Sequence, residues 1–183
     1  GRLFDILGGL LGQKTPEFLN AAGFSSSPHL FYAGTDKAGK WFQLFQIGFG
    51  GIPGRPLGDG PDGHSLFPGF TNVPNEFLER YFPLVIERYE TVPDSGGAGL
   101  HRGGNGIDMV YKFLEPGTIA IHDDRWFVPP WGVNGGAPGA RSWKRLDKAN
   151  GESIALPSKC DGIQVDKGDL LHFVTWGGGG WGD

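Results

Sequence analysis

The chain has 183 residues, a length that allows one hydrophobic core but not two independent domains. Its formal net charge is −4. The acidic balance gives no basis for a nucleic-acid or anionic-membrane partner, because both favour a basic face. The 34 Gly and 14 Pro approach a disordered composition. However, 14 Phe, 6 Trp and 4 Tyr argue for a folded chain, since disordered segments are poor in aromatic residues. No apolar run reaches the roughly 18 residues that span a bilayer.

The first predicted elements are a helix and a hairpin. Within residues 2–12, large apolar side chains recur at helical spacing. They are Leu3, Phe4, Ile6, Leu7, Leu10 and Leu11. Gly8 and Gly9 weaken this helix by about 1 kcal/mol each relative to Ala. Strands are predicted at about 29–34 and 40–48, and the connecting TDKAGK has the Asp and Gly of a hairpin turn.

The middle of the chain combines a long loop with a short helix. Residues 49–69 are dense in Gly and Pro, and loops of this length without secondary structure are usually functional or disordered. We favour a functional loop. NVPNEFLERYF at 72–82 predicts a helix that Asn72 caps, with Pro74 in its first turn and Pro83 after its end.

Short strands dominate the remainder. Alternating apolar residues predict strands at 84–92 and 107–114, and within TIAIHDDRW, SIALP and DLLHFVTW. The predicted fold class is therefore α+β. It is β-rich, with many short strands, long Gly/Pro loops and one or two short helices. Residues 1–183 form either a single domain or part of a larger subunit.

Two nucleotide-binding motifs are near misses. GTDKAGKW at 34–41 has phosphate-loop spacing, but Trp41 replaces the Ser or Thr that holds magnesium. GGAGLHRGG at 96–104 has Arg102 where the dinucleotide fingerprint has its third glycine. No second cysteine is present for a zinc site. Nucleotide chemistry is therefore expected on another chain.

The loop DGPDGH brings Asp59, Asp62 and His64 within six residues. Hard cations bind carboxylates and zinc accepts histidine, so a metal site is one interpretation. The alternative is a set of Asp-Gly turns in which the side chains bond their own backbone. A substrate-facing loop is the functional interpretation, and we assign no metal ligand.

PDSGGAGLHRGGNG at 93–106 is the second candidate segment, with Asp94, Ser95 and Arg102 among its glycines. Glycines let backbone amides approach an anion, and arginine binds a carboxylate or phosphate at two points. This combination predicts substrate binding. A buried crossover in which only glycine fits is the alternative, and both can hold.

IHDDRW at 121–126 is the third candidate segment. Asp123 and Asp124 beside Arg125 suit acid–base work or substrate orientation. The alternative is a strand-end ion pair between Arg125 and one of these carboxylates, packed under Trp126.

The C-terminal region adds a cysteine and a glycine run. Cys160 is the one cysteine, which excludes an internal disulfide and fits a reducing, cytoplasmic compartment. Lys159 can lower the pKa of its thiol, but we treat the thiol as structural. WGGGGWGD at 176–183 predicts a tight architectural turn, and a backbone anion nest is the alternative.

The order of these motifs is more specific than any one of them. The series is GGIPGRPLGDGPDG, TNVPNEFLERYFPLVIERYE, PDSGGAGLHRGGNG, DDRW, PPWGVNGGAPGARS, LPSK and GGGGWGD. It resembles the C-terminal portion of hydantoinase B-type subunits, a family that includes 5-oxoprolinases and is related to acetone and acetophenone carboxylases. The resemblance runs from about residue 43 to the end and is most specific at 72–106.

This resemblance implies an ATP-dependent enzyme in which a hydantoinase A-type partner binds Mg-ATP and activates the substrate. The B-type subunit then opens a lactam or imide ring with water or, in the ketone carboxylases, completes attack on activated bicarbonate. Family subunits are several times longer, and the resemblance implies that a divalent metal would be held by their upstream portion, so no metal ligand is assigned to this chain. The chain alone is expected to be inactive, and a non-catalytic scaffold within such a complex is a further alternative.

Overall fold

The computed structural model describes residues 2–23, 27–65 and 69–183. Its helices are α1 (Arg2–Gly12), a 3-10 turn η1 (Pro16–Phe18) and α2 (Asn75–Tyr81). Its strands are β1 (His29–Thr35), β2 (Trp41–Ile47), β3 (Leu84–Thr91), β4 (Ile107–Phe113), β5 (Gly117–His122), β6 (Trp143–Asp147), β7 (Ser153–Leu156), β8 (Lys159–Val165) and β9 (Leu170–Val174). The predicted β-rich α+β class is confirmed.

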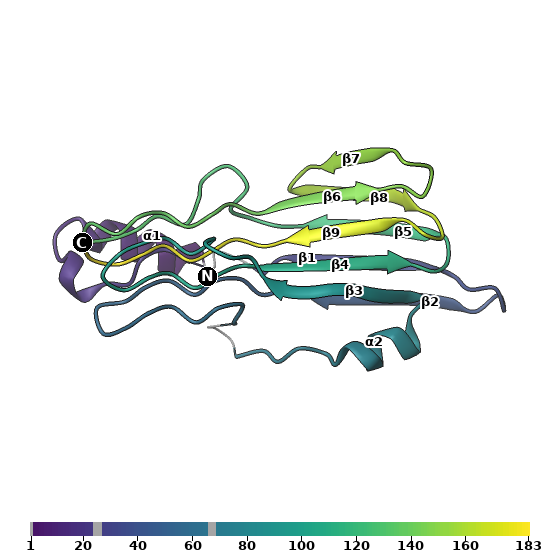
Figure 1. The fold of residues 1–183 in the computed structure, drawn as a ribbon, viewed down its shortest axis with the longest axis horizontal. Coiled ribbons are helices and arrows are strands. Elements are labelled where there is room, and N and C mark those ends of the chain that lie inside the picture. Colours follow the sequence, from purple (N-terminus) through teal and green to yellow (C-terminus); the bar gives the residue numbers. More distant parts are fainter. Residues whose placement is uncertain (1, 24–26, 66–68) are drawn as a thin grey trace.

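The strands form two antiparallel sheets that pack face to face (Figure 1). One sheet has the order β2-β1-β5-β8 and the other β3-β4-β9-β6-β7. Both bury apolar side chains in the core between them. Tyr32 of β1 meets Phe113 of β4 across this core, with ring centroids 4.7 Å apart. Alternation is clear in β2, where Phe42 and Leu44 are buried while Trp41 is exposed, as expected for a strand with one solvated face.

The predicted hairpin is confirmed at residues 35–41. β1 and β2 pair from His29–Ile47 to Thr35–Trp41. Oδ1 of Asp36 accepts hydrogen bonds from the backbone amides of Ala38 and Lys40, at 2.9 and 2.8 Å. Gly39 has a φ of +78°, a conformation that glycine adopts without steric cost.

A bundle of extended glycine-rich segments continues from one end of the sandwich, and we call it the glycine bundle. Its segments are residues 50–64, 95–106, 131–140 and 176–183, which run side by side (Figure 1). The amide of Gly97 donates to the carbonyl of Gly178 at 2.8 Å, and the amide of Gly178 donates to that of Gly104 at 2.9 Å. The amide of Gly54 donates to the carbonyl of Gly179 at 2.8 Å.

Close backbone approach explains the glycines of this bundle. A Cβ added at Gly103, Gly177 or Gly179 would lie 1.9, 1.8 or 2.1 Å from a neighbouring backbone oxygen. Any side chain at these positions would therefore separate the segments. The tight turn predicted for WGGGGWGD is wrong, because residues 176–183 run extended between neighbouring segments and bond to them on several sides.

Helix α2 also differs from its prediction. It begins at Asn75, with Pro74 at its N-cap position and no side-chain cap hydrogen bond. Asn72 therefore does not cap it, and its amide contacts the hydroxyl of Tyr89. Leu78 is buried, and Glu79 accepts a hydrogen bond from the amide of Ile86 at 2.9 Å. These contacts attach the helix to β3.

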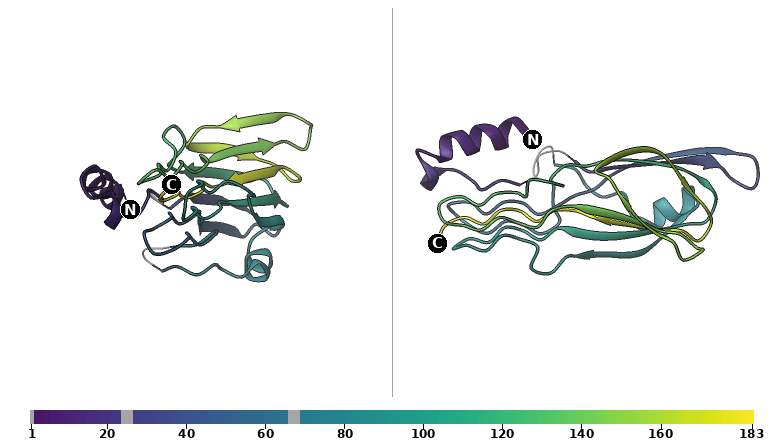
Figure 2. Two further views of the ribbon diagram at one scale, coloured as in Figure 1. Left: turned by 60° about the vertical axis from the view of Figure 1, so that its left-hand side comes forward. Right: turned by 90° about the horizontal axis from the view of Figure 1, so that it is seen from above.

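Helix α1 lies to one side of the glycine bundle (Figure 2). The prediction of a helix at 2–12 is confirmed, and none of its residues is buried. At Gly9 an added Cβ would lie 3.1 Å from the ring of Trp131, so glycine lets the helix approach this indole. Within the described ranges, no helix is long and apolar enough to cross a membrane.

Candidate functional site

Arg102 joins two of the candidate segments. Its Nη1 donates to Oδ1 of Asp62 at 2.6 Å, and its backbone amide donates to Oδ1 of Asp59 at 3.1 Å. The amide of Asn105 also donates to Asp62, at 2.8 Å. The glycines that surround these residues let the two loops approach closely enough for these bonds. We call Asp59, Asp62 and Arg102 the Arg102 cluster.

The Arg102 cluster is charged and reachable from solvent. Burial opposes ionisation of Asp62, but hydrogen bonds from Arg102 and Asn105 outweigh it, so the pKa of this carboxyl lies below its ordinary value. The bond to Asp62 raises the pKa of Arg102. The side chains of Arg102, Asp62 and Asp59 are 48%, 32% and 58% exposed. An incoming ligand can therefore reach all three.

His101 joins this cluster and was not among the candidate residues predicted from the sequence. Its Nδ1 lies 3.5 Å from Oδ1 of Asp59, and its ring lies 5.9 Å from that of Trp181. The sequence feature that could have identified His101 as part of the site is its position next to Arg102 in LHRGG. The distance to Asp59 depends on how two loops meet, and sequence spacing does not report it.

The remaining candidates of these loops make local contacts. Nδ1 of His64 lies 2.7 Å from the carbonyl oxygen of Ser65. Asp94 is exposed and has a φ of +56°, which places it at a turn. Ser95 is buried. Its hydroxyl donates to the carbonyl of Val92 at 2.7 Å and accepts from the amide of Gly106 at 2.8 Å. The hydroxyl of Ser95 therefore bridges the two ends of its own loop.

Asp123 forms a fully buried ion pair with Lys144 of β6, and both side chains are 0% exposed. Nζ of Lys144 also donates to the carbonyl of Val174 at 2.9 Å and lies 4.2 Å from the ring centroid of Phe173. Burial raises the pKa of Asp123 and lowers that of Lys144, in each case against the opposing effect of the partner charge. The desolvation of both ions is thus the largest electrostatic influence here.

The two residues that follow connect the sandwich to α1. Arg125 is buried, pairs with Asp5 of α1 and donates from Nε to the carbonyl of Gly23 at 3.0 Å. Its φ is +58°, which costs a residue with a side chain roughly 1–2 kcal/mol. Asp124 accepts a bond of 3.0 Å from Nε of Arg2 and lies 3.3 Å from Nζ of Lys159. Lys144, Asp5 and Arg2 were all missed from the sequence, because they lie on other elements.

The thiol of Cys160 lies on β8 and is partly buried. Burial raises the pKa of this thiol above its ordinary value, which disfavours the thiolate. This direction agrees with the structural role expected for it.

Sites for a metal or a nucleotide can be tested against these contacts. Among the described residues, no group of three or more His, Cys, Asp or Glu side chains is arranged to hold a metal ion. In residues 34–41 the amides of Ala38 and Lys40 already bond Asp36. This turn therefore does not fit a nucleotide phosphate.

The protein-family comparison decides the family. The protein-family model described as hydantoinase B/oxoprolinase matches residues 1–183 of this chain. The chain belongs to this family. The resemblance inferred from the order of its motifs is thereby confirmed.

Two relatives match nearly the whole length of the chain but are much longer. It is 36% identical to an uncharacterized protein of Methanocaldococcus jannaschii, over 99% of this chain and 31% of that protein. It is 29% identical to a putative D-/L-hydantoinase B-type subunit of a Pseudomonas species, over 98% of this chain and 30% of that protein. The chain therefore spans less than a third of each relative.

Solved structures contain the same fold. An ATP-dependent caprolactamase from Pseudomonas jessenii matches with a TM-score of 0.82 and 22% identity, covering 94% of this chain and 32% of that one. A nucleotide-free acetone carboxylase matches with a TM-score of 0.74 and 19% identity, covering 99% of this chain and 29% of that one. In both, this fold is one part of a longer chain.

Proposed function

We propose that this family member is a component of an ATP-dependent enzyme that hydrolyses a cyclic amide, a lactam or an imide. The observation that carries the proposal is the family match over the whole chain, together with 29% identity to a putative hydantoinase B-type subunit over 98% of it. The caprolactamase with the same fold acts on a lactam, according to its name. A cyclic amide is the substrate class that the name of the relative implies, and the caprolactamase shows that this fold also occurs in an enzyme named for a lactam.

In the enzyme that we propose, nucleotide binding and opening of the ring are carried out by different subunits. Mg-ATP is bound by a hydantoinase A-type subunit and supplies activation of the amide carbonyl. The turn at residues 34–41 does not fit a phosphate, so no nucleotide is assigned to it. The remaining part of the B-type subunit completes the assembly, and a divalent metal is assigned to that part. The 183-residue chain alone is expected to be inactive.

The Arg102 cluster is the proposed substrate-facing part of this chain. Arg102 binds an anionic group of the substrate, since a guanidinium can bind a carboxylate or phosphate in a bidentate manner. Asp94 and Ser95 shape the loop that presents it. Asp59, Asp62 and His64 position water or substrate at this edge of the glycine bundle. The buried residues Asp123 and Arg125 and the partly buried Asp124 support the site by fixing α1 and β6.

Substitution at Arg102 tests this assignment in the reconstituted assembly. Arg102→Ala should lower kcat/KM for a cyclic amide about 10- to 100-fold, because a charge-assisted bond to the substrate is lost. Arg102→Lys keeps the charge but not the bidentate geometry, so it should restore only part of the rate. Arg55→Ala, an exposed position in the turn with Gly58, is the matched control and should leave the rate unchanged.

Native mass spectrometry should precede this kinetic test, to identify the partner subunits. Lost turnover of Arg102→Ala with an intact complex would reject a purely scaffolding role. Unchanged turnover in the same complex would reject the Arg102 cluster as a substrate site.

A ketone carboxylase is the second candidate function. The acetone carboxylase with this fold favours it, although at 19% identity the likeness concerns the fold, which does not determine chemistry. ATP turnover should be measured with a cyclic amide and, separately, with a ketone and bicarbonate. Stimulation by the ketone only when bicarbonate is present would reject the hydrolase.

A further inference from the structure

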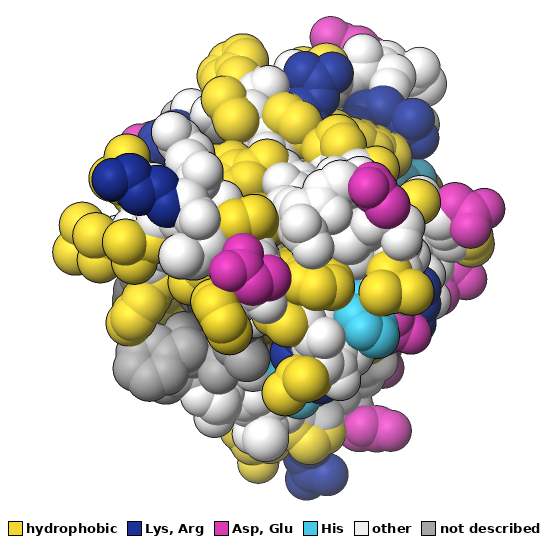
Figure 3. Space-filling view, turned by 90° about the vertical axis from the view of Figure 1, so that its left-hand side faces the viewer, with side chains coloured by type: hydrophobic (Ala, Val, Ile, Leu, Met, Phe, Trp, Pro, Cys, Tyr) yellow, Lys and Arg dark blue, Asp and Glu magenta, His cyan; other side chains and the backbone are white. Residues whose placement is uncertain are grey.

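Helix α1 carries an unusual amount of exposed apolar surface. Leu7, Leu10 and Leu11 are 54%, 60% and 58% exposed, and no residue of the helix is buried. Exposed large apolar residues also occur in η1 and in the loops of the glycine bundle. They are Phe18, Leu57 and Leu100. Hydrophobic side chains are accordingly spread over this end of the molecule (Figure 3).

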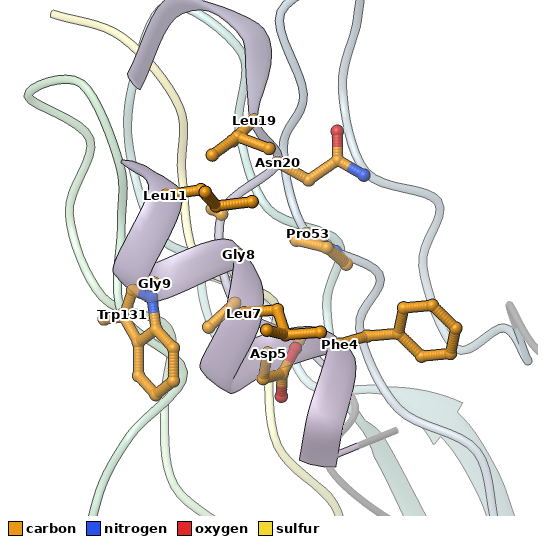
Figure 4. Close-up of a pocket in the computed structure, with 13 residues that line it drawn as sticks. Phe4, Asp5, Leu7, Gly8, Gly9, Leu11, Leu19, Asn20, Pro53 and Trp131 are labelled. Atoms are coloured by element: carbon orange, nitrogen blue, oxygen red, sulfur yellow. The ribbon is translucent and has the colours of Figure 1, made fainter. Parts of the chain in front are cut away.

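A groove separates α1 from the glycine bundle. It has a volume of about 640 Å³. Its apolar lining includes Leu7, Leu11, Leu19, Ala22, Pro53 and Trp131. In the close-up, Leu11 and Leu19 point toward one another, whereas Trp131 lies on the other side of the helix (Figure 4). Among the described residues that line the groove, Asp5 alone is charged, and it pairs with Arg125. The groove therefore suits an apolar occupant and not an ionic one.

We propose that this groove and the apolar side of α1 bind the region of a hydantoinase B-type subunit that lies outside the matched part. This inference rests on the proposed function, because it takes the B-type subunit as the setting of the chain. An 11-residue helix is too short to be stable by its own hydrogen bonds, and contiguous exposed apolar surface usually marks an interaction site.

The length of the relatives favours this occupant over a separate subunit. The matched region is 31% and 30% of two relatives and 32% and 29% of two solved chains, so about two thirds of each is available to cover the groove. Permanent interfaces are more apolar than transient ones. An apolar groove next to a helix with no buried residue fits a permanent neighbour from the same subunit.

Site-specific photo-cross-linking in the cells from which the sequence comes tests the occupant. A benzophenone amino acid is placed at Leu7 and, as control, at Lys37 in the hairpin at the opposite end of the molecule (Figure 1). We expect the Leu7 probe to cross-link to B-type sequence outside the matched region, on the same or a separate polypeptide, and the Lys37 probe not to reach those residues. Cross-links only to a second copy, to an A-type subunit or to nothing would overturn the proposal.

A substitution provides the second measurement. Leu7→Glu should weaken association with that region about tenfold or more, because it places a charge in an apolar contact. Gln13→Glu adds the same charge at an exposed position and should leave association unchanged. Since Leu7 is more than half exposed, the melting temperature of the Leu7→Glu chain should match that of the original. Undiminished association of Leu7→Glu would overturn the proposal.

Failure of this surface and failure of the proposed function have different signatures. Assembly through Leu7 without turnover of any cyclic amide would reject the function and support the surface. Turnover of a cyclic amide with cross-links elsewhere would reject the surface and leave the function in place.

Discussion

The charged residues of the candidate segments include a solvent-exposed group and a buried ion pair. Arg102 and its two aspartates are partly open to solvent and form hydrogen bonds that a ligand can replace. Asp123 and Lys144 are enclosed, with 0% exposure on both sides of the pair. A buried ion pair is weak evidence of net stabilisation, but removing one partner leaves an uncompensated charge. The two groups therefore predict different responses to substitution.

Lys144→Met should lower the free energy of unfolding by about 3–5 kcal/mol, because Asp123 would remain buried without its counter-ion. The double variant Lys144→Met with Asp123→Leu should recover most of this loss, since an apolar pair of similar size needs no desolvation. Urea-induced unfolding of the single and double variants measures both values. A single-variant loss under about 1 kcal/mol would show that the pair is solvated.

The lowered pKa of Asp62 predicts a dependence of stability on pH. A carboxyl whose pKa is lower in the folded than in the unfolded state stabilises the fold above the unfolded pKa, about 4, and loses this contribution as the pH falls through the folded pKa. The stability difference between the original chain and Asp62→Asn should therefore be largest at neutral pH and shrink below about pH 4. Urea unfolding across this range measures it. A constant difference would mean that the Arg102 bond does not depend on ionisation.

At the scale of elements, the glycine bundle is the feature that departs most from ordinary secondary structure. Its segments bond through backbone amides and carbonyls, and most of its glycines lie where an added Cβ would overlap a neighbouring backbone. Gly8 of α1 differs, since nothing lies within 4 Å of a Cβ built there. Glycine is thus required for the close packing of the bundle, whereas at Gly8 it lowers the stability of the helix.

Alanine substitutions should separate these two roles of glycine. Gly178→Ala would place Cβ 2.2 Å from the carbonyl oxygen of Ile52 and should destabilise the fold by about 3 kcal/mol or more. Gly8→Ala meets no neighbour and should stabilise the chain by up to about 1 kcal/mol through helix propensity. Thermal and urea unfolding of both variants provide the measurement. Equal effects at the two positions would contradict the packing described for the bundle.

Agreement between prediction and structure also varied by element. The strands at 29–34 and 40–48 were predicted to within about one residue, since their apolar residues alternate clearly. β6 was missed because its inward positions include a charged residue, Lys144. β8 was missed because Asp161 and Gly162 have the composition of a turn.

At the scale of the whole molecule, both sheets pair strands that are far apart in sequence. β1 pairs with β5, β5 with β8, and β4 with β9. The glycine bundle joins segments from residue 50 to residue 183. Closing such long loops costs entropy before any contact compensates for it.

This topology predicts slow folding. Antiparallel sandwiches with non-local pairing fold in about milliseconds to seconds, whereas helical bundles of similar size fold faster. Stopped-flow refolding followed by tryptophan fluorescence should therefore give a main phase in this range. Trp176 and Trp181 lie within the bundle, so their fluorescence reports its formation. A main phase in microseconds would contradict the dominance of long-range contacts.

The sequence by itself determined the fold class, most of the strands, the helix at 2–12 and the family, because these depend on periodicity, turn chemistry and motif order along the chain. Only the tertiary structure decided that Arg102 meets Asp59 and Asp62, that Asp123 pairs with Lys144, and that WGGGGWGD is an extended segment of a bundle. These contacts join residues on different elements. Spacing along one chain does not record how closely such residues, or the glycine backbones of the bundle, approach in three dimensions.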